Sequence, residues 1–213
     1  MHSYSLALDV DRPLAASSLT AAERHACAAL PTAERRAEWR AGRLAAKRAV
    51  ARMLGLSDLR AIEVRSRPGT RPLVRLPRLS AVVPLTLSIA HAAGRAAAVV
   101  VQARGVGTDR VGVDLERAGT VRSAHARYFL GEAEQSLARR VDLTALWVLK
   151  EAAWKALGLR AETPFTALEL HLGRDGQLAG LSLLGRRRPA RAWLARPWPG
   201  FLLAVVTLPG GRA

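Results

Sequence analysis

Three carboxylates and two lysines combine residue types and spacings that could carry phosphate chemistry. Asp114 and Glu116 stand two residues apart at the end of 111–116, an apolar stretch typical of a strand. Because side chains alternate between the faces of a strand, both carboxylates point the same way, roughly 7 Å apart. Oxygen ligands of this kind suit Mg²⁺, which usually keeps several waters when a protein binds it. A pair of solvated charges ending a strand is the alternative, and it is the more common one for Asp-x-Glu alone.

Glu151 and Lys155 lie in a second segment, 146–158, which the sequence predicts to be helical. Ala and Leu dominate it, no Pro interrupts it, and a glycine can end it. Its start can be capped by Asp142 or Thr144. Because Glu151 and Lys155 are four residues apart, they share one face of the helix.

Lys150 interrupts the apolar stripe of this helix, where an amphipathic helix would carry an apolar residue. Only three of the 33 basic residues are lysines, and two of the three lie in this helix. That usage favours an ammonium over a guanidinium at this place. For the helix alone, chance and a solvated charged face explain the pattern equally well.

Glu151 changes the interpretation of the strand pair if it joins Asp114 and Glu116 in one site. Three buried carboxylates repel one another unless a metal ion neutralises them. Lys150 and Lys155 beside them would suit a ligand that bears phosphate. The sequence therefore predicts a Mg²⁺ site with a phosphate-bearing ligand.

Two further residues could contact such a ligand. His91 follows the apolar strand-like stretch 85–90 and could bind a phosphate or ribose, or carry a proton near neutral pH. A histidine hydrogen-bonded in a turn is the more common alternative. Arg71, in the turn 69–72, could grip a phosphate with two hydrogen bonds. The other histidines lack the spacing of a zinc site, and no glycine-rich nucleotide fingerprint occurs.

The elements that must position these residues follow one pattern twice: a strand, then helices, then strands. In the first half we expect helices from Thr20 and over 32–54, and strands over 3–10, 62–64, 73–76, 85–89 and 96–102. In the second half we expect helical structure over 123–140, with a break near Gly131, and the helix over 146–158. We also expect a hairpin turn at 173–176 and strands over 111–115, 168–172, 181–184, 190–194 and 201–207. The fold class predicted is α+β. The glycine-containing stretch 104–110 divides the chain into predicted domains 1–104 and 105–213.

Composition narrows the class of protein. The chain has 213 residues, half of them apolar, and carries a net charge of +16. No long apolar run indicates a membrane span, residues 1–8 lack the pattern of a signal peptide, and the single Cys27 excludes an internal disulfide. We therefore expect a cytoplasmic protein.

The charge predicts an acidic partner, which could be nucleic acid, an anionic membrane, a polyphosphate ligand or an acidic protein. A nucleic-acid-binding protein is the main alternative from another class. It is disfavoured because the arginines are scattered, apart from one cluster at 186–188, and aromatic residues make up only 5% of the chain. Another Mg²⁺-dependent phosphoryl-transfer enzyme, such as a nuclease, is a further alternative.

Taken together and in order, these residues resemble the 4′-phosphopantetheinyl transferases of the surfactin/enterobactin-synthetase type. The resemblance spans about residues 40 to 160 and rests on five segments: Gly42–Lys47, Gly69–Pro72, Leu87–His91, Gly112–Glu116 and Trp147–Gly158. The last two segments together are specific to the family, and the other three support them. The chain length also agrees with the family.

The resemblance implies two similar α+β halves related by a pseudo-twofold axis, with the active site in the cleft between them. Mg²⁺ would be held there by Asp114, Glu116 and Glu151 and would bridge the diphosphate of coenzyme A. A serine of an acyl or peptidyl carrier protein would attack the β-phosphate. Glu151, directly or through water, would take the proton, and Lys155 would assist the departure of 3′,5′-ADP.

The resemblance also implies which residues bind coenzyme A. They are Arg43, Lys47, Arg71, Pro72, His91, Lys150 and Lys155, with His91 and Arg71 on the adenosine phosphates. The partners would be coenzyme A and an acidic carrier protein, with no nucleic acid and no membrane, and the protein would be a monomer. The pathway of the carrier, whether fatty acid, polyketide, nonribosomal peptide or siderophore, stays open.

The sequence departs from the family at three places. Ala90 and Ala92 flank His91 where serines are usual, which puts one polar contact to the nucleotide in doubt. Arg71 replaces the usual lysine, a change that can preserve phosphate binding. Leu159 and Arg160 follow the helix where the family often has further glycine. None of these changes removes a predicted metal ligand.

Overall fold

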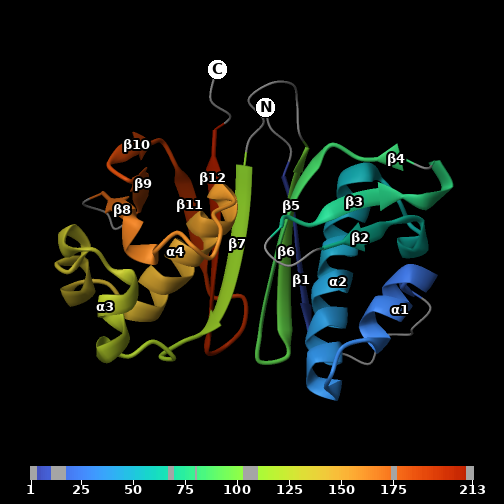
Figure 1. Cartoon of the computed structure of the whole chain (residues 1–213), viewed down its shortest axis with the longest axis horizontal. Helices are drawn as coiled ribbons and strands as arrows, with labels where there is room; N and C mark the ends of the chain where they lie inside the picture. Colours follow the sequence, from blue (N-terminus) through green and yellow to red (C-terminus); the bar gives the residue numbers. More distant parts are fainter. Residues whose placement is uncertain are drawn as a thin grey trace. The chain divides into compact units, whose positions relative to one another are not determined.

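The computed structural model describes residues 4–10, 18–66, 70–79, 81–102, 110–173 and 177–209. The chain forms two compact units, Met1–Gly105 and Val106–Ala213 (Figure 1). Whether these units are domains with the predicted bounds 1–104 and 105–213 stays a prediction. Among the described residues, no helix is both long enough and apolar enough to cross a membrane.

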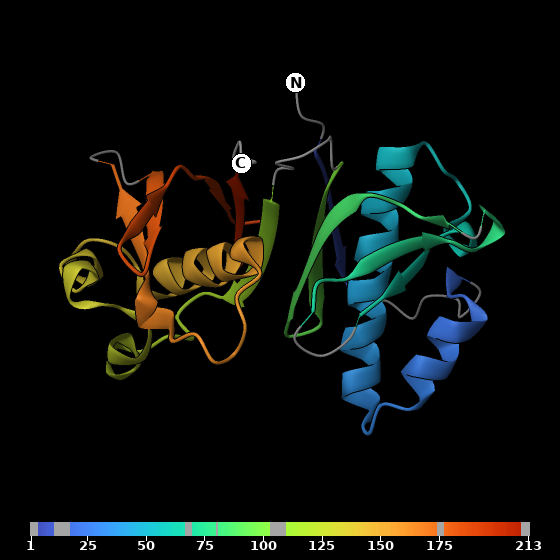
Figure 2. The ribbon, with the colours of Figure 1, turned by 45° about the horizontal axis from the view of Figure 1, so that its top comes forward.

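The first unit is built on an antiparallel sheet with the strand order β1-β6-β5. Its strands are β1 (Tyr4–Val10), β5 (Leu85–Ala92) and β6 (Arg95–Gln102). Helix α2 (Ala33–Leu54) packs along this sheet (Figure 2). The core of the unit is rich in alanine and valine, and these small side chains let the helix lie close to the sheet.

Local signals in the sequence set the ends of the helices in this unit. Thr32 caps α2 by accepting a hydrogen bond from the Arg35 N–H, and Gly55, with φ of 67°, ends it. Helix α1 (Ala21–Ala28) begins with a capping box formed by Thr20 and Glu23. A turn η2 (Leu59–Ala61) then leads to the second sheet, which consists of β2 (Glu63–Arg65), β3 (Leu73–Leu76) and β4 (Ala81–Val82), with η3 (Pro77–Leu79) between the last two.

The hairpin of β5 and β6 is tighter than expected. The predicted strands cover 85–89 and 96–102, but β5 continues to Ala92. Ala93 and Gly94, with φ of 45° and 75°, form a two-residue turn whose left-handed backbone matches the twist of the strands. His91 therefore belongs to the strand, where it pairs with Ala96.

The second unit repeats this plan (Figure 1). Its central sheet is antiparallel with the order β11-β12-β7, formed by β7 (Arg110–Arg117), β11 (Arg191–Ala195) and β12 (Phe201–Leu208). Helix α4 (Leu143–Leu157) packs on β7 and β12. The predicted strands over 111–115, 190–194 and 201–207 are confirmed.

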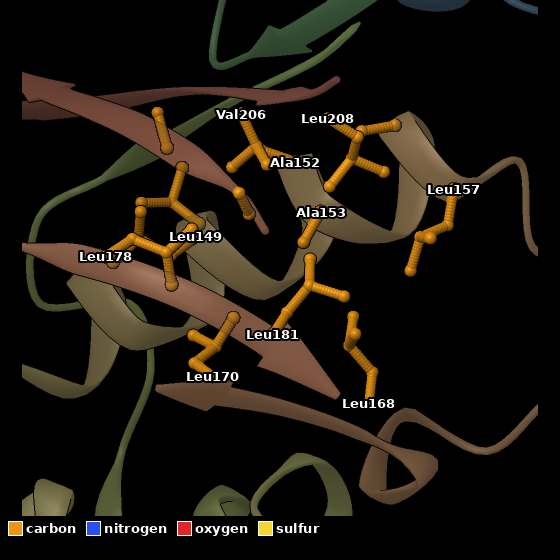
Figure 3. Close-up of a cluster of buried hydrophobic side chains, with 14 of the residues drawn as sticks. Leu149, Ala152, Ala153, Leu157, Leu168, Leu170, Leu178, Leu181, Val206 and Leu208 are labelled. Atoms are coloured by element: carbon orange, nitrogen blue, oxygen red, sulfur yellow. The ribbon is translucent and has the colours of Figure 1, made fainter. Parts of the chain in front are cut away.

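A second sheet covers the other side of α4. It has the order β10-β9-β8 and consists of β8 (Leu168–Leu172), β9 (Leu178–Leu183) and β10 (Arg186–Arg188), with the turn η7 (Phe165–Ala167) leading into it. Figure 3 shows Leu149 and Ala153 of α4 between Val206 of β12 and Leu181 of β9. The arginine cluster noted in the sequence is the exposed strand β10. The hairpin predicted at 173–176 falls largely outside the described residues.

The segment 123–140 is more broken than predicted. Instead of a helix with one break, it forms four short turns: η4 (Ser123–His125), α3 (Ala126–Phe129), η5 (Glu132–Glu134) and η6 (Leu137–Arg139). Phe129 and Glu134 are both buried. Leu130, whose backbone is extended with ψ of 125°, ends α3 between them.

The predicted α+β fold class, with antiparallel sheets packed with helices, is confirmed in both units. Each described unit has one long helix on a three-stranded sheet and a smaller sheet beside it. The implied pseudo-twofold axis and a cleft between the halves stay predictions.

Candidate metal centre

Strand β7 presents Asp114 and Glu116 on the same side. Asp114 pairs with Ala204 of β12, and Glu116 pairs with Leu202. Only 3% of the Asp114 surface is exposed, whereas Glu116 is partly exposed. The strand therefore places one carboxylate inside the unit and the second nearer its surface.

Gly112 lets helix α4 lie directly against β7. A Cβ atom at this position would lie 1.9 Å from the carbonyl oxygen of Ala152 and 2.5 Å from the backbone nitrogen of Ala156. No side chain fits there, because both neighbours are backbone atoms that cannot rotate away. The glycine two residues before Asp114 thus sets the distance between the strand and the helix that carries Glu151.

The ends of α4 are fixed by the residues named in the sequence. Asp142 caps the helix by accepting a hydrogen bond from the Ala145 N–H, and Gly158, with φ of 69°, ends it. Thr144 does not cap the helix. Its buried hydroxyl accepts hydrogen bonds from the N–H groups of Gly119 and Val121, which ties the loop after β7 to the first turn of α4. This tie supports the alignment of the helix with the strand.

Strand and helix together form a cluster of three carboxylates. One carboxylate oxygen from each of Asp114, Glu116 and Glu151 lies within 4.8 Å of the others. Lys155, one helical turn after Glu151, donates a hydrogen bond from Nζ to Asp114 Oδ1 at 2.6 Å. Its Nζ also lies 3.7 Å from Glu151 Oε2, and 32% of its side chain is exposed. The three predicted carboxylates thus lie together, with the Lys155 ammonium beside them.

The electrostatics of the cluster favour an additional positive charge. Burial raises the pKa of Asp114 well above its ordinary value, and Glu151 raises it further, although Lys155 opposes both effects. Burial also raises the pKa of Glu116. Burial lowers the pKa of Lys155, but Asp114 and Glu151 more than offset this, so the net shift is upward. One ammonium does not fully neutralise three carboxylates.

The donor set fits a hard divalent cation. Asp114 Oδ2 is buried and has no hydrogen-bond partner among the described residues, although an unpaired buried oxygen is costly. A cation bound between the carboxylates would satisfy it. All three donors are carboxylate oxygens, the ligands that Mg²⁺ prefers, and none is a softer sulfur or nitrogen ligand.

Trp147 contacts the carboxylate cluster, and the sequence reasoning gave it no role. Its indole Nε1–H donates a hydrogen bond to Glu116 Oε1 at 3.1 Å. The ring contacts Phe129 and Phe165, with centroid distances of 5.2 and 5.0 Å, so its orientation is well supported. The available signal was its place four residues before Glu151, which puts both side chains on one face of the helix.

The structure buries Lys150 and Lys47, two of the predicted coenzyme A contacts. The Lys150 side chain is fully buried, and its Nζ pairs with Glu134 Oε2 at 2.5 Å. The Lys47 side chain is likewise fully buried, and it pairs with Glu23. In this structure both lysines are buried counter-ions of glutamates. Their predicted contacts to coenzyme A stay predictions.

The other predicted ligands of coenzyme A belong to the first unit. His91 is about half exposed on β5, and its Nδ1 lies 3.9 Å from Glu38 Oε2 of α2. Arg43 is mostly buried on α2, with its guanidinium 4.5 Å from the ring centroid of Trp39. Arg71 and Pro72 are partly buried just before β3. Their roles toward coenzyme A stay predictions.

Comparison with known proteins finds a similarity that is confined to the second unit. Residues 110–206 match the model of the 4′-phosphopantetheinyl transferase superfamily. This segment contains all three carboxylates, Trp147 and Lys155. No curated protein is significantly similar to the chain. The resemblance to the superfamily is confirmed, while the surfactin/enterobactin type stays a prediction.

Solved structures with similarity to the chain include two holo-[acyl-carrier-protein] synthases. That of Thermotoga maritima is 28% identical, with a TM-score of 0.39 over 46% of this chain and 62% of its own. That of Bacillus anthracis, in complex with CoA (3′,5′-ADP), is 26% identical, with a TM-score of 0.40 over 46% of this chain and 92% of its own. The chain thus spans 62% of the length of the first of these proteins.

Proposed function

We propose that this chain, which carries the motifs of the 4′-phosphopantetheinyl transferase superfamily in its second unit, is such a transferase. It would move the 4′-phosphopantetheine arm of coenzyme A to a serine of an apo acyl or peptidyl carrier protein and release 3′,5′-ADP. The observation that carries the proposal is the cluster of Asp114, Glu116 and Glu151 beside Lys155, because all four lie within the segment that matches the superfamily.

In this proposal, Asp114, Glu116 and Glu151 hold Mg²⁺. When bound, the ion supplies positive charge to the diphosphate of coenzyme A, and phosphoryl transfer depends mainly on such neutralisation. The buried Asp114 oxygen and the raised pKa of this carboxyl support the assignment, because both features penalise the cluster without a cation.

Glu151 and Lys155 would carry the proton and the leaving group. Glu151 would accept the proton of the attacking serine hydroxyl, directly or through a water, because its carboxylate is the partly exposed one on the helix. The Lys155 ammonium would stabilise the negative charge that develops on the departing 3′,5′-ADP. Its upward-shifted pKa keeps it protonated for this role at neutral pH.

Residues of the first unit would bind the adenosine end of coenzyme A. We assign His91 and Arg71 to its phosphates, with Arg43 and Pro72 as further contacts. Lys47 and Lys150, which are buried in this structure, remain predicted contacts. The net charge of +16 would favour encounter with an acidic carrier protein. A monomeric state and a cytoplasmic location stay predictions.

A mass measurement tests the proposal. The protein is incubated with coenzyme A, Mg²⁺ and a panel of apo carrier proteins, and each carrier is then weighed. Transfer adds about 340 Da to the modified serine. The Asp114→Asn and Glu151→Gln variants should lose this transfer, whereas Asp58→Asn, at a partly exposed residue of the first unit, should keep it. No mass gain on any carrier would contradict the function, and full transfer by Asp114→Asn would contradict the metal site.

A further inference from the structure

One buried carboxylate joins three segments of the second unit. Glu134, of which only 1% is exposed, accepts a hydrogen bond from Lys150 Nζ of α4 on its Oε2 atom. The same oxygen accepts the Gly131 N–H at 3.0 Å, and Oε1 accepts the Leu170 N–H of β8 at 2.8 Å. The carboxylate thus connects η5, the middle of α4 and the first strand of the smaller sheet.

The first unit contains a matching arrangement. Glu23 pairs with Lys47 of α2, accepts the Thr20 N–H at 2.9 Å on Oε2, and accepts the Val64 N–H of β2 at 2.9 Å on Oε1. In both units a glutamate three residues into a capped turn therefore binds a lysine of the long helix and a backbone N–H of the smaller sheet. The recurrence indicates that, within each unit, a glutamate–lysine pair ties the long helix to the smaller sheet.

Only the second unit has a metal ligand next to this lysine. Lys150 precedes Glu151 directly, and neighbouring residues of a helix point about 100° apart around its axis. Anchoring Lys150 toward β8 therefore fixes the direction in which Glu151 points toward β7. In the first unit, the residue after Lys47 is Arg48, and the described part of that unit contains no comparable carboxylate cluster.

We propose that Glu134 and Lys150 are positioning residues of the metal centre, which hold α4 in the rotation that brings Glu151 to Asp114 and Glu116. The inference deepens the proposed function, on which its activity readout rests. Its main readout is the binding of Mg²⁺ in the absence of coenzyme A and carrier protein. An experiment can therefore contradict the positioning inference and the proposed function separately.

The test compares the two glutamate–lysine pairs. Glu134→Gln and the double variant Glu134→Gln with Lys150→Met are measured beside Glu23→Gln and Glu23→Gln with Lys47→Met. The double variants remove both charges together, so they avoid the severe penalty of leaving one buried charge unpaired. For each protein, thermal unfolding reports stability, and titration calorimetry reports the dissociation constant for Mg²⁺.

We expect both pairs of variants to lose thermal stability, and only those at Glu134 and Lys150 to bind Mg²⁺ more weakly, by about 10- to 100-fold. Transfer by the Glu134 variants should recover when Mg²⁺ is raised above the weakened dissociation constant. Unchanged Mg²⁺ affinity in the folded Glu134 and Lys150 double variant would overturn the inference. An equal loss of affinity in the Glu23 variants would also overturn it, because the effect would then follow general destabilisation.

If the wild-type protein binds Mg²⁺ but modifies no carrier, the proposed function fails while the inference on positioning stands. If the wild-type protein does not bind Mg²⁺ even at millimolar concentrations, the metal centre itself is wrong, and the inference falls with it.

Discussion

Lys155 Nζ donates a hydrogen bond to Asp114 Oδ1 at 2.6 Å and thereby places a positive charge against the carboxylates that would hold a metal ion. The same ammonium lies 3.7 Å from Glu151 Oε2. The lysine and a bound metal ion would thus compete for one negatively charged cluster. When coenzyme A is bound, its phosphates would offer the ammonium an alternative partner.

This competition gives the first prediction. Replacing Lys155 with Met should tighten the binding of Mg²⁺ to the free protein by about tenfold, because a nearby like charge is removed. The same change should abolish transfer, since the leaving group loses its cation. Calorimetric titration measures the first effect and the carrier assay the second. Lys155→Arg, which keeps the charge, should not tighten binding. Weaker Mg²⁺ binding by the Met variant would contradict the competition.

The second prediction concerns pH. The pKa of Asp114 is raised in the folded protein, mainly by burial, so this carboxyl keeps its proton to a higher pH than an ordinary aspartate. A metal ion binds the ionised form, so Mg²⁺ affinity should fall as the pH falls through this raised pKa. Binding in that range should also release a proton.

Proton release can be measured by titrating Mg²⁺ in two buffers of different ionisation enthalpy at the same pH. The observed enthalpy should differ between the buffers in proportion to the protons released. An identical enthalpy in both buffers, from pH 5 to pH 8, would show that Asp114 does not hold a proton that the metal displaces.

Gly112 provides the third prediction. Gly112→Ala should separate α4 from β7, because its Cβ would lie 1.9 Å from the Ala152 carbonyl oxygen. Overpacking of this kind costs about 1–3 kcal/mol of unfolding free energy, or more where backbone atoms clash. Displacement of the helix should also weaken Mg²⁺ binding. Denaturant unfolding and calorimetry measure the two effects.

Gly42→Ala is the matched control on the helix of the first unit. Its Cβ would meet only the side chains of Ile89, at 3.1 Å, and His91, at 3.9 Å. Side chains can adjust more readily than backbone, so the loss of stability should be smaller and the Mg²⁺ affinity unchanged. A Gly112→Ala protein with wild-type stability and metal affinity would refute the close-approach argument.

Trp147 gives the fourth prediction. Trp147→Phe retains an aromatic ring against Phe129 and Phe165 but removes the hydrogen bond to Glu116. The lost bond should cost about 1–3 kcal/mol of stability, since its acceptor is charged. With Glu116 no longer oriented, Mg²⁺ binding should weaken by about tenfold or more.

Trp154→Phe controls for the loss of indole area. Trp154 stacks on the same Phe165, with ring centroids 4.2 Å apart, and lies about two turns closer to the end of α4. This variant should lose comparable packing and keep its Mg²⁺ affinity. If both tryptophan variants weaken metal binding alike, the role assigned to the Trp147 hydrogen bond is incorrect.

The sequence alone determined the features that depend on local geometry. Asp114 and Glu116 share a side of β7 because strand side chains alternate, and Glu151 and Lys155 share a face of α4 because the helix turns every 3.6 residues. The caps at Thr20 and Gly158 follow from side-chain and backbone preferences within four residues, whereas the sequence left Asp142 and Thr144 as alternative caps of α4. The motifs also predicted the resemblance to the superfamily that residues 110–206 show.

Only the tertiary structure decided which side chains remain available for chemistry. The sequence placed Lys150 within an apolar stripe, and the fold buries it there. Its partner Glu134 lies 16 residues away in a segment that the sequence predicted as helix. The sequence also did not predict the hydrogen bond from Trp147 to the carboxylate of Glu116, 31 residues away. Such contacts depend on how strand, helix and turn pack together, and residue periodicity does not specify that packing. For this reason the sequence predicted the acidic triad, while the fold assigned the two buried lysines to its framework.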